Sequence, residues 1–150
     1  MIKRMWLKTA AALVLGIAAA LPVAATETPA SLPGVKNVGA DEVKKLLDSG
    51  VPVIDTRVAA EYAEKTIKGA KSVPYKEKSA KEPGFDASQD QFDLSKLPGD
   101  KAAPLVFFCN SGECWKSYKA SVVAQKAGYT KIHWFRGGFP EWSAKGLPTQ

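Results

Sequence analysis

Residues 104–109 read Pro-Leu-Val-Phe-Phe-Cys, and this stretch decides the fold. Its apolar residues do not alternate with polar ones, which is typical of a strand buried on both faces within a parallel sheet. Along the rest of the 150-residue chain, short apolar runs alternate with helical patterns, and this predicts an α/β domain with a parallel sheet. Ligands bind such sheets beyond the carboxyl ends of the strands. Cys109 ends this strand and Asp55 ends another, so both are candidates for the functional site.

Periodicity and breaker residues define the remaining elements. The first helical pattern places Val43, Leu46 and Leu47 on one face and stops at Gly50. We expect strands at 51–54, 71–73, 104–108 and 132–135, helices at 41–49, 59–65 and 116–127, and a short final helix that carries Trp142.

Residues 75–103 form a long polar stretch interrupted by two Pro-Gly pairs. A loop of this length is unusual in a small domain and is often functional, although a solvated insertion is an equal alternative. It is a candidate surface for a protein partner. Four apolar side chains are expected to hold it to the domain: Phe85, Phe92, Leu94 and Leu97.

The N-terminus has the pattern of a secretory signal peptide. Lys3, Arg4 and Lys8 precede an apolar run over 9–25, which ends in small residues suited to cleavage after Ala25. The alternative is an uncleaved anchor, but the run is shorter than the roughly 20 residues that a spanning helix needs. The expected organisation is a signal peptide at 1–25, a linker at 26–37 and a domain at 38–150, in a periplasmic or otherwise exported protein.

Cleavage would change the charge of the chain. It removes three basic residues and no acidic one, so the formal net charge falls from +6 to +3. No stripe of basic residues with interleaved aromatics remains, which argues against nucleic-acid binding. After cleavage no membrane contact is expected either.

The loop after Cys109 joins a buried strand to a helix. Its backbone N–H groups and the helix N-terminus can form a concavity that binds anions, and a cysteine at its base is expected to exist largely as thiolate. Gly112 would permit a positive φ in this curl. The alternative is a buried apolar cysteine that merely ends the strand. The other candidate residues of this cradle are Asn110, Ser111, Gly112, Glu113, Trp115, Lys116 and Ser117.

Cys114 is the second of the two cysteines and lies five residues after Cys109. A disulfide over so short a span would constrain little of the chain, which favours a chemical role such as a resolving thiol. The alternative is a small residue packed at the helix entrance. His133, the only histidine, lies within a strand, so a Cys-His hydrolase is not indicated. The residues offer neither a metal site nor a cofactor motif.

Several ordered motifs together resemble the rhodanese family. These are Asp55-Thr56-Arg57, Glu61-Tyr62, the segments 67–70 and 73–74, the Cys109 loop, Ala127-Gly128-Tyr129, and Arg136-Gly137-Gly138 with Trp142. The resemblance covers about residues 38–148 and is greatest to exported single-domain rhodanese-like proteins of bacteria, here with a Cys-x4-Cys-Trp loop.

This resemblance implies a rhodanese-like fold, with a five-stranded parallel sheet and helices on both faces. It implies a sulfurtransferase in which Cys109 takes sulfane sulfur as a persulfide from a small donor and passes it to a thiol acceptor. Asp55 and Arg57 match residues that support the active site. Two departures concern the loop, which is about two residues longer than usual and has no arginine. In the family an arginine of this loop often helps to bind thiosulfate. Depending on the alignment, Lys116 or Cys114 takes the position of that arginine, which argues against thiosulfate as the physiological donor.

Three other functions remain open. A longer loop on this fold can accommodate phosphatase or arsenate-reductase chemistry, but that chemistry relies on an arginine clamp that this loop lacks. Cys109 and Cys114 could serve thiol–disulfide exchange with little sulfur transfer. A non-catalytic binding domain could use residues 75–103 to contact its partner.

Overall fold

The computed structural model describes Gly16 and residues 27–150. Apart from Gly16, the predicted signal peptide lies outside the described residues. No helix in the described part has the length and apolar character needed to span a bilayer.

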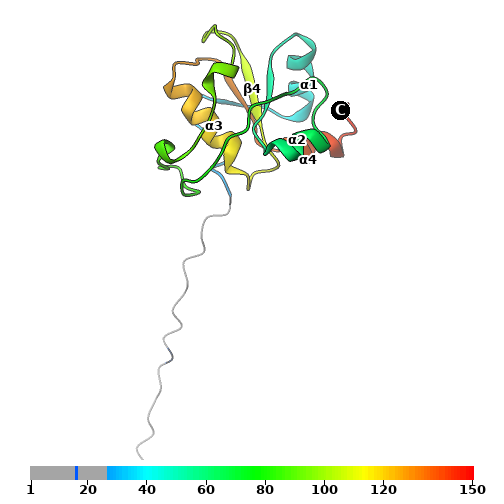
Figure 1. Cartoon of the computed structure of the whole chain (residues 1–150). Helices are drawn as coiled ribbons and strands as arrows, with labels where there is room; N and C mark the ends of the chain where they lie inside the picture. Colours follow the sequence, from blue (N-terminus) through cyan, green and yellow to red (C-terminus); the bar gives the residue numbers. More distant parts are fainter. Residues whose placement is uncertain (1–15, 17–26) are drawn as a thin grey trace, which may run out of the picture.

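A five-stranded parallel sheet forms the centre of the described domain (Figure 1). The strand order is β1-β5-β4-β2-β3, so the first strand lies at one edge and the third at the other. Both the α/β class and the parallel sheet are therefore confirmed. The strands are β1 (Lys36–Asn37), β2 (Val53–Asp55), β3 (Lys71–Ser72), β4 (Leu105–Phe108) and β5 (Ile132–Phe135).

The central strand β4 is buried along its whole length, as its apolar sequence predicted. Leu105 and Phe107 belong to one core cluster, whereas Val106 and Phe108 belong to the cluster on the opposite face. This division follows from the alternation of side chains along a strand. Complete burial on both faces explains why the run has no polar residue.

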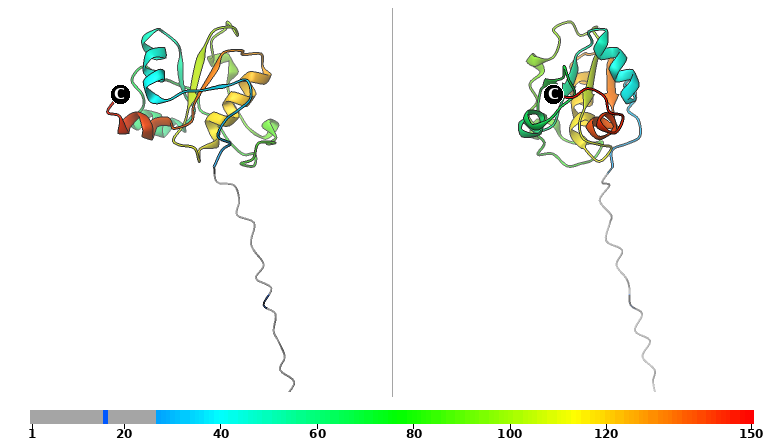
Figure 2. Two further views of the ribbon diagram at one scale, coloured as in Figure 1. Left: turned by 180° about the vertical axis from the view of Figure 1, so that it is seen from behind. Right: turned by 90° about the vertical axis from the view of Figure 1, so that its right-hand side faces the viewer.

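Helices cover both faces of the sheet (Figure 2). Ala120 and Ala124 of α3 pack in the cluster that contains Leu105 and Phe107. Val43 of α1 and Trp142 of α4 pack in the other cluster. The helices are α1 (Ala40–Asp48), α2 (Ala59–Glu64), α3 (Trp115–Lys126) and α4 (Gly138–Ala144).

The long segment 75–103 runs beside α3 and contains the short 3-10 turns η1 (Ala87–Gln89) and η2 (Leu94–Lys96) (Figure 1). Phe85 and Leu97 are buried, and Phe92 and Leu94 pack against the core. The four apolar side chains therefore hold this segment to the domain as predicted.

The segment predicted as a linker, 26–37, is structured where the structure describes it. Lys36–Asn37 forms β1 and pairs with β5. Thr28 is buried, and the side chain of Gln125 on α3 donates to the Pro33 carbonyl. Its Thr, Pro and Ala composition concealed this role because the segment is held by hydrogen bonds to distant parts of the chain rather than by an apolar pattern of its own.

Candidate active site

Cys109 lies at the carboxyl end of β4, at the start of the loop that leads to α3. Its side chain is buried, and it forms a disulfide with Cys114. The two Cα atoms are 6.1 Å apart. The structure therefore brings together the predicted nucleophile and the predicted resolving thiol.

The loop between the cysteines presents polar backbone groups at this position. Cys114 is the N-cap residue of α3, and its backbone N–H donates to the Ser111 carbonyl at 2.9 Å. The N–H groups of Asn110, Ser111, Gly112 and Glu113 donate to no acceptor among the described residues. Four such groups beside a helix N-terminus, where the dipole is positive, are suited to stabilising an anion.

Gly112 has a different role from the one predicted. Its φ is not positive, so the expectation of a left-handed conformation was wrong. Its importance is spatial, because a Cβ atom there would lie 2.8 Å from Nη1 of Arg136 and 2.9 Å from Cζ. The Arg136 guanidinium occupies the volume that a side chain would need.

A second close approach holds the start of the loop. Gly138 has a φ of 61°, and a Cβ atom there would collide with the carbonyl oxygens of Cys109 and Asn110. The next residue, Phe139, donates its backbone N–H to the Cys109 carbonyl at 2.9 Å. The turn into α4 therefore fixes the backbone of Cys109.

Asp55 and Arg57 form a buried ion pair beside the loop. Arg57 Nη2 lies 2.8 Å from Asp55 Oδ2, and both side chains are almost completely buried. The Thr66 hydroxyl donates to the same carboxylate oxygen at 2.8 Å, and Arg57 also donates to the Lys65 carbonyl. A buried ion pair needs such additional partners to offset the loss of hydration.

Glu61 connects this ion pair to the cysteine loop. Its Oε2 lies 3.5 Å from Arg57 Nη1 and accepts a hydrogen bond from Asn110 Nδ2 at 2.8 Å. The Arg57–Glu61–Asn110 chain thus ends on the residue that follows Cys109. This arrangement gives Asp55 and Arg57 a contact path to the loop.

A sequence profile of the rhodanese-like domain matches residues 39–145. The chain belongs to the rhodanese family. Thiosulfate sulfurtransferase 16, a chloroplast protein of Arabidopsis thaliana, is 29% identical over 105 residues, covering 70% of this chain and 84% of that protein.

Solved structures show the same fold. The human single-domain sulfurtransferase TSTD1 has a TM-score of 0.54 and 28% identity, over 74% of this chain and 97% of that one. A rhodanese-like domain from Anabaena, solved by NMR, has a TM-score of 0.57 and 21% identity. The match covers 76% of this chain and 77% of the Anabaena chain.

Two of the predicted loop residues belong to the core. The Trp115 ring is buried and packs edge-on against Tyr118, with ring centroids 5.2 Å apart. The buried Ser117 hydroxyl accepts a hydrogen bond from Trp134 Nε1 at 2.9 Å. Both side chains therefore fix the first turn of α3, and neither lies in the cradle. Glu113, in contrast, is exposed on the loop.

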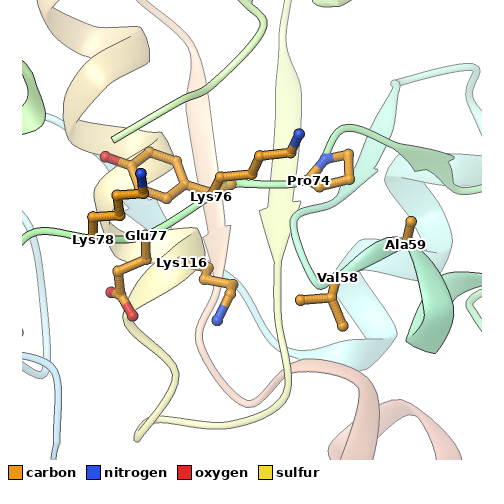
Figure 3. A pocket seen from close by; sticks show the side chains of 8 residues that line it. Val58, Ala59, Pro74, Lys76, Glu77, Lys78 and Lys116 are labelled. Atoms are coloured by element: carbon orange, nitrogen blue, oxygen red, sulfur yellow. The ribbon is translucent and has the colours of Figure 1, made fainter. Parts of the chain in front are cut away.

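Lys116 lines a pocket of about 380 Å³. Figure 3 shows Lys78 and Lys116 toward one side and Val58, Ala59 and Pro74 toward the other, with Lys76 between them. Lys116 lies two residues after Cys114 in the first turn of α3. The pocket therefore borders the same end of the sheet as the cysteine loop.

A buried polar network that the sequence did not predict holds one wall of this pocket. Lys119 of α3 is completely buried, and its Nζ lies 2.8 Å from Glu77 Oε2 and donates to Ser79 Oγ at 2.8 Å. The Asp90 carboxylate accepts hydrogen bonds from Ser79 and Tyr75. Only the polar character of residues 75–103 hinted at such a network.

Thr28 and the role of Arg136 were also not predicted. Thr28 donates to the Gly112 carbonyl, and Arg136 lies against Gly112 and donates to Thr28. Arg136 stood in a recognised motif, whereas Thr28 carried no signal because its partner is 84 residues away in the chain.

Proposed function

We propose that this rhodanese is a sulfurtransferase that carries sulfane sulfur as a persulfide on Cys109. The observation that carries the proposal is the place of Cys109: it ends the central strand and begins a loop whose amides, with the α3 N-terminus, can stabilise a thiolate or persulfide. A relative named as a thiosulfate sulfurtransferase supports the reaction class. The signal-peptide pattern predicted over residues 1–25 supports our proposal of an exported, periplasmic location.

The proposed transfer has two displacement steps. The Cys109 thiolate attacks the terminal sulfur of a sulfane donor, forming a new S–S bond while the donor's S–S bond breaks. The rest of the donor leaves with the electron pair. An acceptor thiolate then attacks the terminal persulfide sulfur, and Cys109 leaves as thiolate. No net oxidation accompanies these two steps.

The disulfide requires a reduction before this cycle can begin. In the bonded form neither cysteine carries a free thiolate, so a dithiol reductant must supply two electrons to open the bond. We propose that the bonded form is the resting state in an oxidising compartment.

The same bond supports a second function, thiol–disulfide exchange with Cys114 as the resolving thiol. The Cys114 thiolate can attack Cys109 Sγ of the persulfide, forming the Cys109–Cys114 bond and expelling hydrosulfide with the electron pair. The terminal sulfur is thereby reduced to sulfide and the two cysteines are oxidised to the disulfide.

Mass spectrometry of the dithiol-reduced protein, freed of reductant and treated with a sulfane donor, tests both ideas. We expect a transient one-sulfur gain on Cys109 in the parent, and no gain in Cys109→Ser. The matched variant Cys114→Ser should retain its persulfide, whereas the parent should release hydrosulfide and return to the disulfide. Transfer by Cys109→Ser at the parent rate would refute the sulfurtransferase proposal, and equal persulfide lifetimes in the parent and Cys114→Ser would refute resolution by Cys114.

A further inference from the structure

The pocket beside the cysteine loop is open to a ligand larger than a small inorganic ion. Its volume of about 380 Å³ lies within the range of roughly 300–1,000 Å³ typical of sites for organic ligands. Val58, Ala59 and Pro74 supply apolar wall. A tetrahedral inorganic anion would leave most of that wall without contact.

Val58 contributes exposed apolar surface to this wall. It is the one large apolar side chain that is exposed among the described residues, with 45% of its surface accessible. It precedes α2, where it contributes its carbonyl to the first turn. An apolar group on an organic ligand would remove this side chain from water.

Three lysines supply positive charge around the same pocket: Lys76, Lys78 and Lys116. None of them forms an ion pair within the part of the chain that the structure describes. The one acidic residue of the lining, Glu77, is already paired with the buried Lys119. The lysine charges are therefore available to an anionic ligand.

The wall that carries two of these lysines is held in place. Glu77 and Ser79 point to Lys119, while Lys76 and Lys78, which alternate with them along the chain, are exposed. This alternation is that of an extended chain, and the Lys119 contacts fix which residues face the pocket mouth. The anion site therefore does not depend on a freely moving loop.

Backbone hydrogen bonds link this pocket to the strand that ends at Cys109. Thr56 donates its N–H to the carbonyl of Phe108, the residue before Cys109, at 3.0 Å. Tyr75, a pocket residue, donates its N–H to the Thr56 carbonyl at 3.0 Å. Two backbone hydrogen bonds thus connect the pocket wall to the strand end that carries the nucleophile.

We propose that this pocket binds the body of the sulfur donor, and that the donor is a carboxylate-bearing organic persulfide. Its carboxylates pair with Lys76, Lys78 and Lys116, its apolar part covers Val58 and Pro74, and its terminal sulfur reaches Cys109 once the disulfide is reduced. The inference rests on the proposed sulfurtransferase function and specifies its substrate class.

Steady-state sulfur transfer tests this in the Cys114→Ser background, which cannot return to the disulfide, with glutathione persulfide and thiosulfate compared as donors at physiological salt. In the double variant Lys76→Ala/Lys78→Ala we expect KM for glutathione persulfide to rise about tenfold, with little change in kcat, because two exposed ion pairs are lost. KM for thiosulfate should change less than twofold. Lys126→Ala, which removes an exposed charge from the far end of α3, is the matched control.

A binding measurement separates the pocket from the chemistry. Calorimetry of S-methylglutathione with Cys109→Ser should show binding that weakens about tenfold when the two lysines are also replaced. Unchanged affinity, or an equal KM increase for both donors, would overturn the pocket assignment. If the parent transfers sulfur from neither donor while S-methylglutathione still binds through the lysines, the proposed function fails and the binding site stands.

Discussion

Thr28 donates two hydrogen bonds to the carbonyl of Gly112, from its backbone N–H at 2.8 Å and from its hydroxyl at 2.7 Å. Arg136 holds Thr28 in turn, donating from Nε to the hydroxyl oxygen at 3.1 Å and from Nη2 to the Thr28 carbonyl at 2.8 Å. The segment before β1 therefore clamps the middle of the loop between the two cysteines.

We expect Thr28→Val to make the Cys109–Cys114 disulfide easier to reduce. The substitution removes the hydroxyl's bond to the Gly112 carbonyl and its bond from Arg136 Nε, while it keeps the side-chain shape and the backbone hydrogen bonds of residue 28. The reduced loop is then less restricted, so Cys114 spends less time within reach of Cys109. A threefold to tenfold fall in the equilibrium constant for disulfide formation is expected, and tenfold corresponds to about 30 mV.

Titration against glutathione buffers with mass-spectrometric readout measures this effect. Thr130→Val, at an exposed threonine in the turn after α3, serves as the control. A lower melting temperature with an unchanged potential would show that Thr28 only stabilises the fold.

Gly112→Ala should destabilise the domain by about 1–3 kcal/mol, the usual cost of inserting atoms into a filled space. The new methyl group would lie within 3.0 Å of three guanidinium atoms of Arg136, which must move and release Thr28. Gly99→Ala is the matched control, because a Cβ atom at Gly99 has no neighbour within 4 Å. Equal urea midpoints for the two variants would contradict this interpretation.

Asp55→Asn should cost about 3–5 kcal/mol, because it leaves the buried guanidinium of Arg57 without its charge partner. Asp48→Asn removes an exposed partner of Lys44 and should cost less than about 1 kcal/mol. Urea unfolding of both variants provides the comparison. If Asp55→Asn is as stable as Asp48→Asn, the buried pair is not a structural support of the loop.

The sequence was sufficient to predict elements whose evidence is local. The strand at 104–108 was recognised because complete burial on both faces requires an uninterrupted apolar run, and the prediction of the Cys109 loop followed from its place after that strand. β1 was missed because Lys36 and Asn37 are exposed and carry no strand pattern. These two residues form a strand only because they pair with β5, which lies far away in the sequence.

The unpredicted parts of the site are long-range polar contacts. A lysine within a helix is expected at the surface, yet Lys119 is buried because residues 77–79 bring a carboxylate and a hydroxyl to it. The sequence suggests that Gly112 is needed for its conformational freedom. In the structure, Gly112 is needed because the Arg136 guanidinium fills the space that a side chain would occupy. Neither partner can be inferred from spacing in one sequence.

Because of Asp90, we expect the free energy of unfolding to fall at acidic pH. Burial by itself would raise the pKa of this carboxyl, but hydrogen bonds from Ser79, Tyr75 and the Lys78 backbone outweigh it and hold the pKa at about 2, below its ordinary value of 3.8. The folded state thus favours the charged form. This contribution to stability is fully present above the ordinary pKa and is lost as the pH falls toward 2.

Asp90→Asn should therefore be less stable than the parent at pH 7, by about 1–3 kcal/mol for the weakened hydrogen bonds. The difference in unfolding free energy should stay constant down to about pH 5 and shrink between pH 5 and pH 2, as the parent carboxylate becomes protonated. Urea unfolding of both proteins across this pH range measures the difference in unfolding free energy. The other carboxylates titrate in both proteins, so their effect cancels in this difference. A difference that is the same at pH 7 and pH 2.5 would mean that the charge of Asp90 does not stabilise the pocket wall.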